Sequence, residues 1–319
     1  MEKLIGITMG DVAGVGPEII LKVIKDYPEA IIYGSYDVLS YYNTKYEHHF
    51  NIVKISSPEE YDETKVNVVD PLPISMNEFE VGVVSPECGK RSYLYCEKAI
   101  SDALDKKIGA VVTCPLNKEA LHLGGYNYDG HTEIFAKLTD TKEYGMLLWS
   151  EKLKTIHNTT HCSLKTAIER CKKDRIISKT LLAYNTLKKA GYEDPRIAIA
   201  GLNPHAGENG LFGDEEIKEI IPAVEELKKM GINVDGPVAP DTVFLKCYKG
   251  QYDVVVAMYH DQGHIPLKMM DFDGGVNMTV GLPIIRTSVD HGTAFDIAGK
   301  NIANKKSLIE AIEAAKRLI

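Results

Sequence analysis

Histidines follow three strand-like segments of this chain, and the last of these segments leads into the richest group of chemically useful side chains. The apolar, β-branched run at residues 252–258 is followed by His260, Asp261 and His264, with Lys268 four residues further on. Such a run is typical of a buried parallel strand, and ligands bind beyond the carboxyl ends of these strands in open α/β sheets. We therefore expect a binding site here, with a solvated strand-end loop as the simpler alternative.

The same arrangement occurs twice more. Residues 196–202 run into His205, and residues 154–158 end shortly before His161. Neutral imidazole is the commonest protein ligand for divalent transition metals. No His-Glu-x-x-His spacing is present, so the hypothesis of a metal site depends on the three strand ends together. A hydrogen-bonded loop residue would explain each histidine taken alone.

Further groups suit an anionic ligand. The glycine-rich turn at residues 10–18 links a predicted strand to a helix and could hold a phosphate against its amides. Its spacing matches neither the Rossmann fingerprint nor the P-loop, and Pro17 removes one donor, so a tight turn that shapes the floor of a site is the alternative. His131 and Thr132 stand before an apolar helix start, where they could bind a carboxylate or phosphate or simply cap the helix.

Two cations and an amide surround another strand-like run, at residues 276–280. Lys268, Asn277 and Arg286 are spaced nine residues apart. An arginine can bind a phosphate by paired hydrogen bonds and a lysine as a point charge. Because exposed cations are common, the trio alone only suggests a phosphorylated ligand.

Composition excludes several classes of protein. The net charge of -8 over 319 residues argues against a nucleic-acid binder. No apolar run approaches the roughly 20 residues that span a bilayer, so we expect no membrane association. Met1-Glu2-Lys3 leads directly into a predicted strand, so we expect no secretory signal. The six cysteines form no Cys-x-x-Cys pair, which is typical of reduced thiols in a cytoplasmic enzyme. Cys162, beside His161, could be a nucleophile, but a bystander thiol is the simpler interpretation.

Strand-like and helical segments alternate along the chain, which predicts a mainly parallel sheet with right-handed crossovers. Asp214 should cap a helix in which Pro222 produces a kink or lies where its missing donor does little harm. Ser307 should begin the C-terminal helix as a capping box with Glu310. The polar region from residue 43 to 80 should be peripheral. Other strands are predicted at residues 4–8, 30–33 and 108–113, and other helices at residues 17–25, 91–107 and 176–187.

Five motifs occur in order along nearly the whole chain, and together they resemble the 4-hydroxythreonine-4-phosphate dehydrogenase family. The resemblance implies an α/β fold like that of isocitrate and isopropylmalate dehydrogenases, with two α/β/α subdomains and a cleft between them. The expected boundaries are residues 1–127 plus 288–319 for one subdomain and residues 128–287 for the other. The motifs are GDVAGVGPE at 10–18, GHTE at 130–133, GLNPHAGE at 201–208, MYHDQG at 258–263 and IRTSVDHGTA at 285–294.

Two further segments, ENGLFGD at 208–214 and GHIP at 263–266, are more similar to the branch that acts on 4-phospho-D-threonate or 4-phospho-D-erythronate. The alternative is the branch of pyridoxal phosphate (vitamin B6) biosynthesis, whose members more often carry leucine where His264 stands. One departure from the family is Val12, where members usually carry proline. It affects the rigidity of the first turn and removes no reacting group.

The resemblance also implies roles for individual residues. The ligands of one divalent metal ion (Zn, Mg, Mn or Co), shared across a homodimer interface, would be His161, His205 and His260. The substrate contacts would be His131, Thr132, Lys268, Asn277 and Arg286. Residues 290–304 are similar to the adenine-binding loop of isopropylmalate dehydrogenases, which implies NAD without a Rossmann fingerprint. The cofactor contacts would then include His291, Gly292, Thr293, Ala294 and Asp296.

The implied reaction is oxidation of a secondary alcohol followed by loss of carbon dioxide. NAD would take the hydride, and the metal would activate the hydroxyl and polarise the resulting carbonyl. The expected product is dihydroxyacetone phosphate from a phosphothreonate, or an aminoketone phosphate from phosphohydroxythreonine. Asp241 and Asp261 are the candidate general bases. Two rivals remain, a phosphate acyltransferase on the same fold and a binding protein for phosphorylated acids that has lost catalysis.

Overall fold

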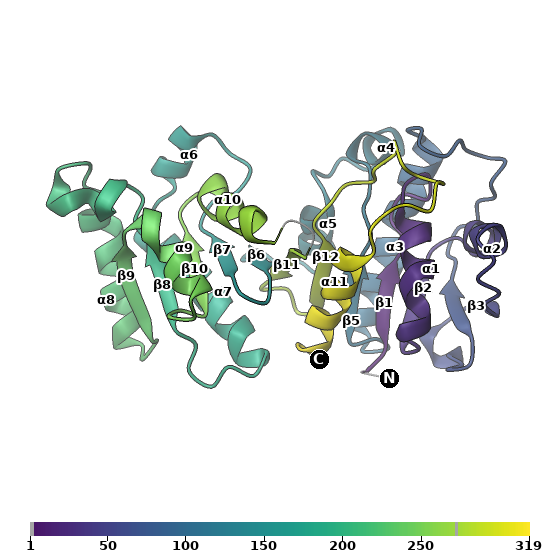
Figure 1. Cartoon of the computed structure of the whole chain (residues 1–319), viewed down its shortest axis with the longest axis horizontal. Coiled ribbons are helices and arrows are strands. Elements are labelled where there is room, and N and C mark those ends of the chain that lie inside the picture. Colours follow the sequence, from purple (N-terminus) through teal and green to yellow (C-terminus); the bar gives the residue numbers. More distant parts are fainter. Residues whose placement is uncertain (1–2, 272–273) are drawn as a thin grey trace. The chain divides into compact units, whose positions relative to one another are not determined.

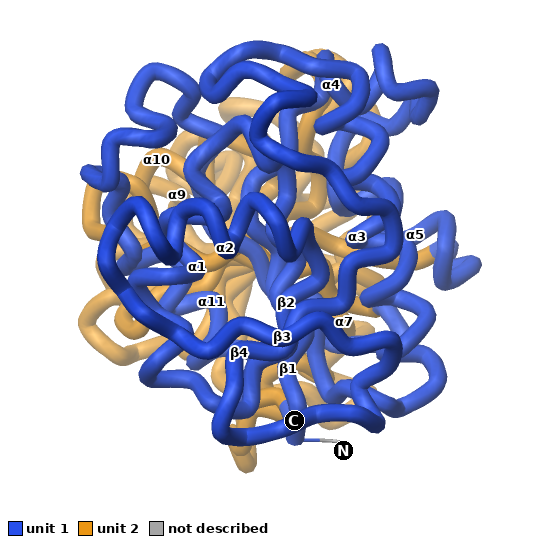
Figure 2. Tube along the Cα trace, turned by 90° about the vertical axis from the view of Figure 1, so that its right-hand side faces the viewer, with its two compact units in different colours: residues 1–142, 282–317, 319 blue, residues 143–281, 318 orange. Residues whose placement is uncertain are grey.

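The computed structural model describes residues 3–271 and 274–319, which form two compact units (Figure 2). Unit 1 contains the described residues up to Lys142 together with Leu282–Arg317, and unit 2 contains Glu143–Gly281. The two terminal segments share unit 1. Helix α5 (His131–Leu138) packs on helix α3 (Pro86–Leu104), and strand β12 (Ile285–Val289) pairs with strand β5 (Ala110–Thr113), so residues 128–142 and 282–287 belong to unit 1.

The sheet of unit 1 is wholly parallel. Every residue of its strands β1, β2 and β5 is buried, which explains why these strands read as continuous apolar runs. In sheet order its strands are β3 (Ile52–Ile55), β4 (Val66–Val69), β2 (Ala30–Tyr33), β1 (Ile5–Thr8), β5 (Ala110–Thr113) and β12 (Ile285–Val289).

Helices cover both faces of this sheet because the chain moves outward from β1 in one direction and then crosses back in the other. α1 (Gly16–Val23), α2 (Tyr36–Lys45) and α11 (Lys306–Lys316) form one layer, with the short helix η1 (Ile24–Asp26) after α1. α3 (Pro86–Leu104), with α4 (Lys118–Leu123) and α5 (His131–Leu138) packed against it, covers the other face (Figure 1).

The predicted cap of the C-terminal helix is wrong. Helix α11 begins at Lys306, with Lys305 as its N-cap, so Ser307 lies inside the first turn. The Ser307 hydroxyl instead accepts a hydrogen bond from the Asp290 amide at 3.1 Å. A serine that could cap its own helix therefore fixes the end of β12, a tertiary contact that local sequence does not reveal.

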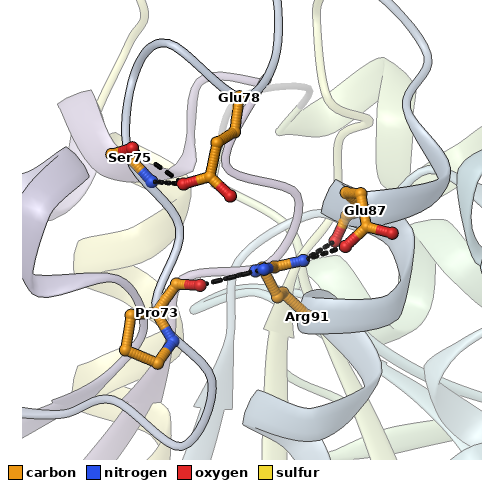
Figure 3. Close-up of polar contacts among 5 residues, drawn as sticks. All are labelled: Pro73, Ser75, Glu78, Glu87 and Arg91. Carbon is orange, nitrogen blue, oxygen red and sulfur yellow. Dashed lines mark hydrogen bonds and ion pairs between the residues drawn. The ribbon is translucent and has the colours of Figure 1, made fainter.

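The region from residue 43 to 80 lies at the edge of the sheet, as predicted, and includes β3, β4 and the short helix η2 (Pro58–Glu60). The loop after β4 is tied to helix α3 by Arg91, whose side chain is buried (Figure 3). Its Nε and Nη2 donate to the Pro73 carbonyl at 3.1 and 2.9 Å, and its Nη1 donates to the Glu87 carbonyl at 3.1 Å. Ser75 closes a tighter turn by donating to Glu78 from both its amide and its hydroxyl at 2.7 Å.

The sheet of unit 2 is mixed. Its four strands β7, β10, β8 and β9 are parallel, whereas β6 runs antiparallel to both of its neighbours. Leu148, Val255 and Phe244 belong to the buried cluster between this sheet and helix α9. In sheet order the strands are β11 (Val276–Val280), β6 (Gly145–Trp149), β7 (Lys154–His157), β10 (Val254–Ala257), β8 (Ile197–Ala200) and β9 (Val234–Val238).

Helices α7 and α8 pack together on one face of this sheet, and α9 and α10 contact it from the other (Figure 1). Pro222 lies at the start of α8, directly after a π-helical turn, so its missing donor falls where the helix type changes. No helix in the described residues has the length and apolarity that a membrane crossing requires. The helical elements are α6 (Leu164–Glu169), α7 (Lys173–Lys189), η3 (Pro204–Gly210), η4 (Glu216–Ile220), α8 (Ile221–Lys229), α9 (Pro240–Tyr248) and α10 (His260–Met270).

Candidate active site

The three strand ends that the sequence singled out lie at one edge of one sheet. β7, β10 and β8 are adjacent and parallel, so their carboxyl ends point the same way. His161 follows β7, His205 follows β8, and His260 follows β10. The segment after β10 is a helix and not the expected loop, because α10 begins at His260 itself and continues through Pro266.

His161 and His260 lie close together beside a pocket of about 280 Å³. Their ring centroids are 5.7 Å apart. The pocket therefore presents two neighbouring imidazoles, which is half of a typical histidine metal site. Its lining residues are Thr160, His161, Cys162, Leu164, Tyr259, His260 and Asp261.

Asp261 fixes the protonation pattern of His260. The His260 Nδ1 lies 2.7 Å from Asp261 Oδ1. Because a carboxylate oxygen accepts, Nδ1 carries the hydrogen in this contact, and in the neutral imidazole this tautomer leaves the lone pair on Nε2. A carboxylate that orients a ligating histidine in this way is the usual outer partner of a metal site. Both side chains are partly exposed, so the pair orients the ring and adds little stability.

A second layer of histidines supports His260. The His264 ring stacks on the His260 ring, with centroids 3.6 Å apart. His264 Nδ1 lies 3.0 Å from the His260 carbonyl and 3.1 Å from His157 Nε2. The carbonyl can only accept, so His264 Nδ1 carries the hydrogen and His157 Nε2 accepts it. Burial lowers the pKa of His157 to about 3 and keeps this imidazole neutral.

Sequence reasoning missed the part played by His157, although a histidine that ends a fully buried strand was a visible signal. Gly263 makes the contact possible, since a Cβ at that position would lie 2.5 Å from His157 Nε2. The His157–His264–His260 chain is therefore built into the packing of α10 on β7.

His205 is not among the residues that line this pocket. It begins a run of six residues, His205–Gly210, in which every φ angle is positive. Among residues 3–271 and 274–319, no three His, Cys, Asp or Glu side chains come together to hold a metal ion. Of the three expected ligands, the structure brings His161 and His260 together beside one pocket. Asp241, one candidate base, is exposed in the first turn of α9, which packs against η3.

Unit 1 contains a buried cation beside a neutral histidine. Arg286 on β12 is 3% exposed, and its Nη2 donates to Thr113 Oγ1 at 2.8 Å. Burial lowers the pKa of Arg286 to about 10, so it remains charged at neutral pH. Burial and the charge of Arg286 hold the pKa of His131 well below its usual value. His131 Nε2 is buried and has no hydrogen-bond partner among the described residues, and Thr132 is the next residue of the same helix, α5.

Lys268 and Asn277 belong to unit 2, so the five expected substrate contacts divide between the units. Lys268 lies in the last turn of α10, and Asn277 lies on β11 opposite Leu148 of β6. The Asn277 Oδ1 is buried without a hydrogen-bond partner in the described part of the chain. An open amide oxygen on a strand is a suitable acceptor for a substrate hydroxyl or ammonium group.

Helix α1 and the glycine-rich turn before it hold the segment at residues 290–304. The Val15 amide donates to the Thr293 carbonyl at 3.1 Å, and a Cβ on Gly14 would lie 2.9 Å from that same oxygen. Glu18 is fully buried and accepts from the Gly299 amide. Lys22 donates to the Asn301 and Ala303 carbonyls at 3.0 and 2.8 Å. These contacts favour a supporting role for the turn over a phosphate cradle.

The expected cofactor contacts are spread along the first part of this segment. His291, Gly292 and Asp296 are exposed, whereas Thr293 and Ala294 are half-buried. No atom approaches the position that a Cβ on Gly292 would occupy, so the backbone is open there.

Comparisons with known proteins identify the family of this chain. Residues 26–315 match the family described as Pyridoxal phosphate biosynthetic protein PdxA. The D-threonate 4-phosphate dehydrogenase of Pectobacterium atrosepticum is 45% identical over 100% of both chains. The 4-hydroxythreonine-4-phosphate dehydrogenase of Aquifex aeolicus is also 45% identical, over 100% of this chain and 99% of that one. The crystal structure of 4-hydroxythreonine-4-phosphate dehydrogenase from Klebsiella pneumoniae superposes with a TM-score of 0.90, at 46% identity over 99% of each chain.

Proposed function

Because the chain belongs to the family of the pyridoxal phosphate biosynthetic protein PdxA, we propose that it oxidises and decarboxylates 4-phospho-D-threonate or 4-phospho-D-erythronate, yielding dihydroxyacetone phosphate. The observation that carries the proposal is the pair formed by Arg286 and His131. A guanidinium that is almost fully buried beside a neutral imidazole with an open ring nitrogen forms a site for an anionic group. The dehydrogenases named in the comparisons act on phosphorylated acids of this kind.

In the proposed complex, Arg286 and Lys268 bind the phosphate. The planar guanidinium supplies paired hydrogen bonds and the ammonium supplies a point charge. His131, being neutral, contributes a hydrogen bond without repelling Arg286. The open Asn277 Oδ1 accepts from a hydroxyl group of the substrate, and Thr132 is assigned as a second contact by the family resemblance.

Two groups that the family implies would supply the redox chemistry. A bound divalent metal lowers the pKa of the substrate hydroxyl and polarises the carbonyl, and NAD accepts the hydride. The protein holds the metal through His161, His205 and His260, and imidazole ligands favour zinc or cobalt over magnesium. His260 is prepared for this by the proton that Asp261 holds on its Nδ1. Asp261 is thereby engaged, which leaves Asp241 as the preferred general base.

We further propose that the functional unit is a cytoplasmic homodimer whose metal site draws on both chains. His161 and His260 line one pocket without His205, and no three His, Cys, Asp or Glu side chains of the described residues come together to hold a metal ion, so we take the third ligand from a second copy. Exposed apolar side chains lie near both parts, with Leu211 72% exposed beside η3 and Met269 82% exposed on α10. Each of these two side chains would lose apolar surface to water if a second copy covered it. The six cysteines are all free thiols, which supports a reducing compartment.

The second candidate substrate is 4-hydroxy-L-threonine 4-phosphate. The equal identity to the Aquifex aeolicus enzyme favours it as much as the Pectobacterium atrosepticum enzyme favours phosphothreonate. The two substrate classes differ at C2, which carries a hydroxyl in one and an ammonium group in the other. His264 is buried against the candidate ligand His260, so it is the residue that we propose senses this difference.

The test compares kcat/KM for the three phosphorylated acids with NAD, in the wild type and in His264→Leu. We expect higher efficiency on phosphothreonate or phosphoerythronate, and a smaller preference in the variant because the imidazole that accepts from the C2 hydroxyl is lost. His122→Leu, which changes a histidine of unit 1 that bonds only the Tyr128 carbonyl, is the control and should keep the preference. Higher wild-type efficiency on phosphohydroxythreonine would reverse the choice of substrate.

A further inference from the structure

The turn that carries His205 is strained. His205, Ala206, Glu208 and Asn209 all have φ between 44° and 55°, with only Gly207 and Gly210 as glycines in the run. A left-handed conformation costs an L-residue roughly 1–2 kcal/mol, and such residues normally occur singly. Four of them in one short run persist only if the surrounding structure holds them, and such strain is concentrated at functional sites.

One buried carboxylate holds the start of this turn. Glu216 is 1% exposed, and its Oε1 accepts from the amides of Leu202 and Asn203 at 2.7 and 2.8 Å. Its Oε2 accepts from the Asn203 Nδ2 at 2.9 Å. Three donors from the two residues that precede Pro204 and His205 thus converge on one side chain, and hydrogen bonds to a buried charge are among the strongest in proteins.

The same carboxylate also lies against the middle of the turn. A Cβ on Gly207 would lie 2.7 Å from Glu216 Oε2, so the backbone there packs directly on the carboxylate. Glu216 begins the π-helical turn η4, which joins α8. π-helical turns inside helices are rare and often occur at functional sites. Here the π-helical turn η4 places the Glu216 carboxylate against the left-handed run at residues 205–210.

We propose that Glu216 is the positioning residue for His205, holding the left-handed turn so that this imidazole is presented to the metal. The inference rests on the metal site of the proposed function and adds a residue to it. Glu216 does not contact the metal in this account, because its oxygens are occupied by the two amides and the Asn203 side chain. Its effect on the site passes through the backbone of residues 202–207.

The test uses Glu216→Gln, which keeps the shape but replaces one acceptor oxygen with a donor. In either orientation of the new side-chain amide, its NH2 group points at another hydrogen-bond donor. The hydrogen bonds that hold one end of the left-handed turn are therefore lost. Glu215→Gln is the matched control, because Glu215 accepts only from the Asn203 side chain and from no backbone amide described here. Two measurements are made: zinc affinity by competition with a chelator, and hydrogen exchange at residues 203–212 in metal-free protein.

For Glu216→Gln we expect zinc affinity to fall about tenfold, as for other outer partners of metal ligands, and exchange at residues 203–212 to accelerate. The affinity for NAD should stay unchanged, which separates local release of the turn from general loss of structure. Gly207→Ala provides a second route, because the added methyl group meets the carboxylate and the φ of +81° disfavours alanine. It should weaken zinc binding in the same way.

Unchanged exchange and zinc affinity in both variants would overturn the proposal, and so would an equal effect of Glu215→Gln. If Glu216→Gln fails to fold, Gly207→Ala alone decides between these outcomes. If wild-type protein binds no zinc while exchange still accelerates in Glu216→Gln, the metal site of the proposed function has failed and the hold of Glu216 on the turn stands.

Discussion

The position of one proton on the His260 ring decides which ring nitrogen can bind a metal ion. Asp261 holds that proton on Nδ1, and the stacked His264 and the buried His157 fix the ring from behind. The sequence indicated that Asp261 and His260 belong to one site but left Asp261 open as a general base. The 2.7 Å contact with His260 favours the orienting role, so we propose Asp241 as the general base.

Two substitutions separate these roles. Asp261→Ala should weaken zinc affinity about 10- to 100-fold, because the proton on His260 is no longer held in place. Asp241→Asn should lower kcat by about 10²- to 10⁴-fold and leave zinc affinity unchanged, because a general base acts on the substrate alone. Chelator competition and steady-state kinetics on the same preparations provide both readings. The reverse pattern would exchange the two assignments.

Asp11 in the glycine-rich turn is a buried carboxyl whose charge destabilises the fold. Burial raises its pKa from 3.8 to about 6, although the Ala13 amide donates to it. The folded protein therefore binds more protons than the unfolded chain between pH 3.8 and about 6. The free energy of unfolding falls as pH rises through this window and stays lower above it.

The substitution Asp11→Asn removes the destabilisation that the buried, ionised carboxylate causes. At pH 8 the variant should be more stable than the wild type by up to about 3 kcal/mol, since one pKa unit corresponds to about 1.4 kcal/mol. At pH 3, below both pKa values, the difference should nearly vanish, because the carboxyl is then mostly protonated in the folded and the unfolded states. Urea unfolding at the two pH values measures it. The same difference at both values would contradict a raised pKa at Asp11.

At the scale of elements, helix α1 supports the segment that we propose binds NAD. Lys22 donates to two carbonyls of that segment, and Glu18 accepts from the Gly299 amide. Neither contact could be predicted, because the partners are about 280 residues apart in sequence. The turn at residues 10–18 was recognisable by its glycines, but its contact with the segment at residues 290–304 was not.

Lys22→Met should therefore weaken NAD binding severalfold, because residues 301–303 lose their anchor while the apolar part of the side chain is kept. Zinc affinity should not change. Lys98→Met is the matched control in unit 1, since its ammonium contacts Asp102 and no described residue of the 290–304 segment. Calorimetric titration of NAD into each variant makes the comparison. Equal affinity in all three proteins would show that the anchor is not needed.

Strands and helices could be predicted from the sequence where one or both of their faces are buried. β2 and β11 match the predicted segments at residues 30–33 and 276–280, because a continuous apolar run defines β2 and an alternation of apolar and polar residues defines β11. Helix α10 and the left-handed turn at His205 were not predictable. Proline and glycine residues in both segments, such as Pro266, are more typical of loops than of ordered elements. The structure of α10 depends on its packing on β7, and that of the turn depends on the hydrogen bonds of Glu216.

At the scale of the whole molecule, the division of the chain followed from the resemblance, whereas the boundaries depended on pairings such as β12 with β5. The family and the dehydrogenase activity are confirmed by the comparisons. No three His, Cys, Asp or Glu side chains of the described residues come together to hold a metal ion, so the proposed three-histidine site takes one ligand from a second copy.

Mixing two inactive variants tests that arrangement. His205→Ala and His260→Ala should each be inactive, because each removes one ligand from every site. If the site takes His205 from one chain and His260 from the other, exchange of subunits creates one complete site in each mixed dimer, and activity returns. Mixtures that stay inactive after verified subunit exchange would place all three ligands within one chain.

The central claim is a metal-dependent oxidative decarboxylation of a 4-phosphorylated hydroxy acid by NAD. The most direct test follows NADH and dihydroxyacetone phosphate together from 4-phospho-D-threonate, with and without a chelator. We predict equal amounts of both products, loss of both in metal-depleted protein, and recovery when zinc or cobalt is restored. NADH without dihydroxyacetone phosphate, or full turnover in metal-depleted protein, would contradict it.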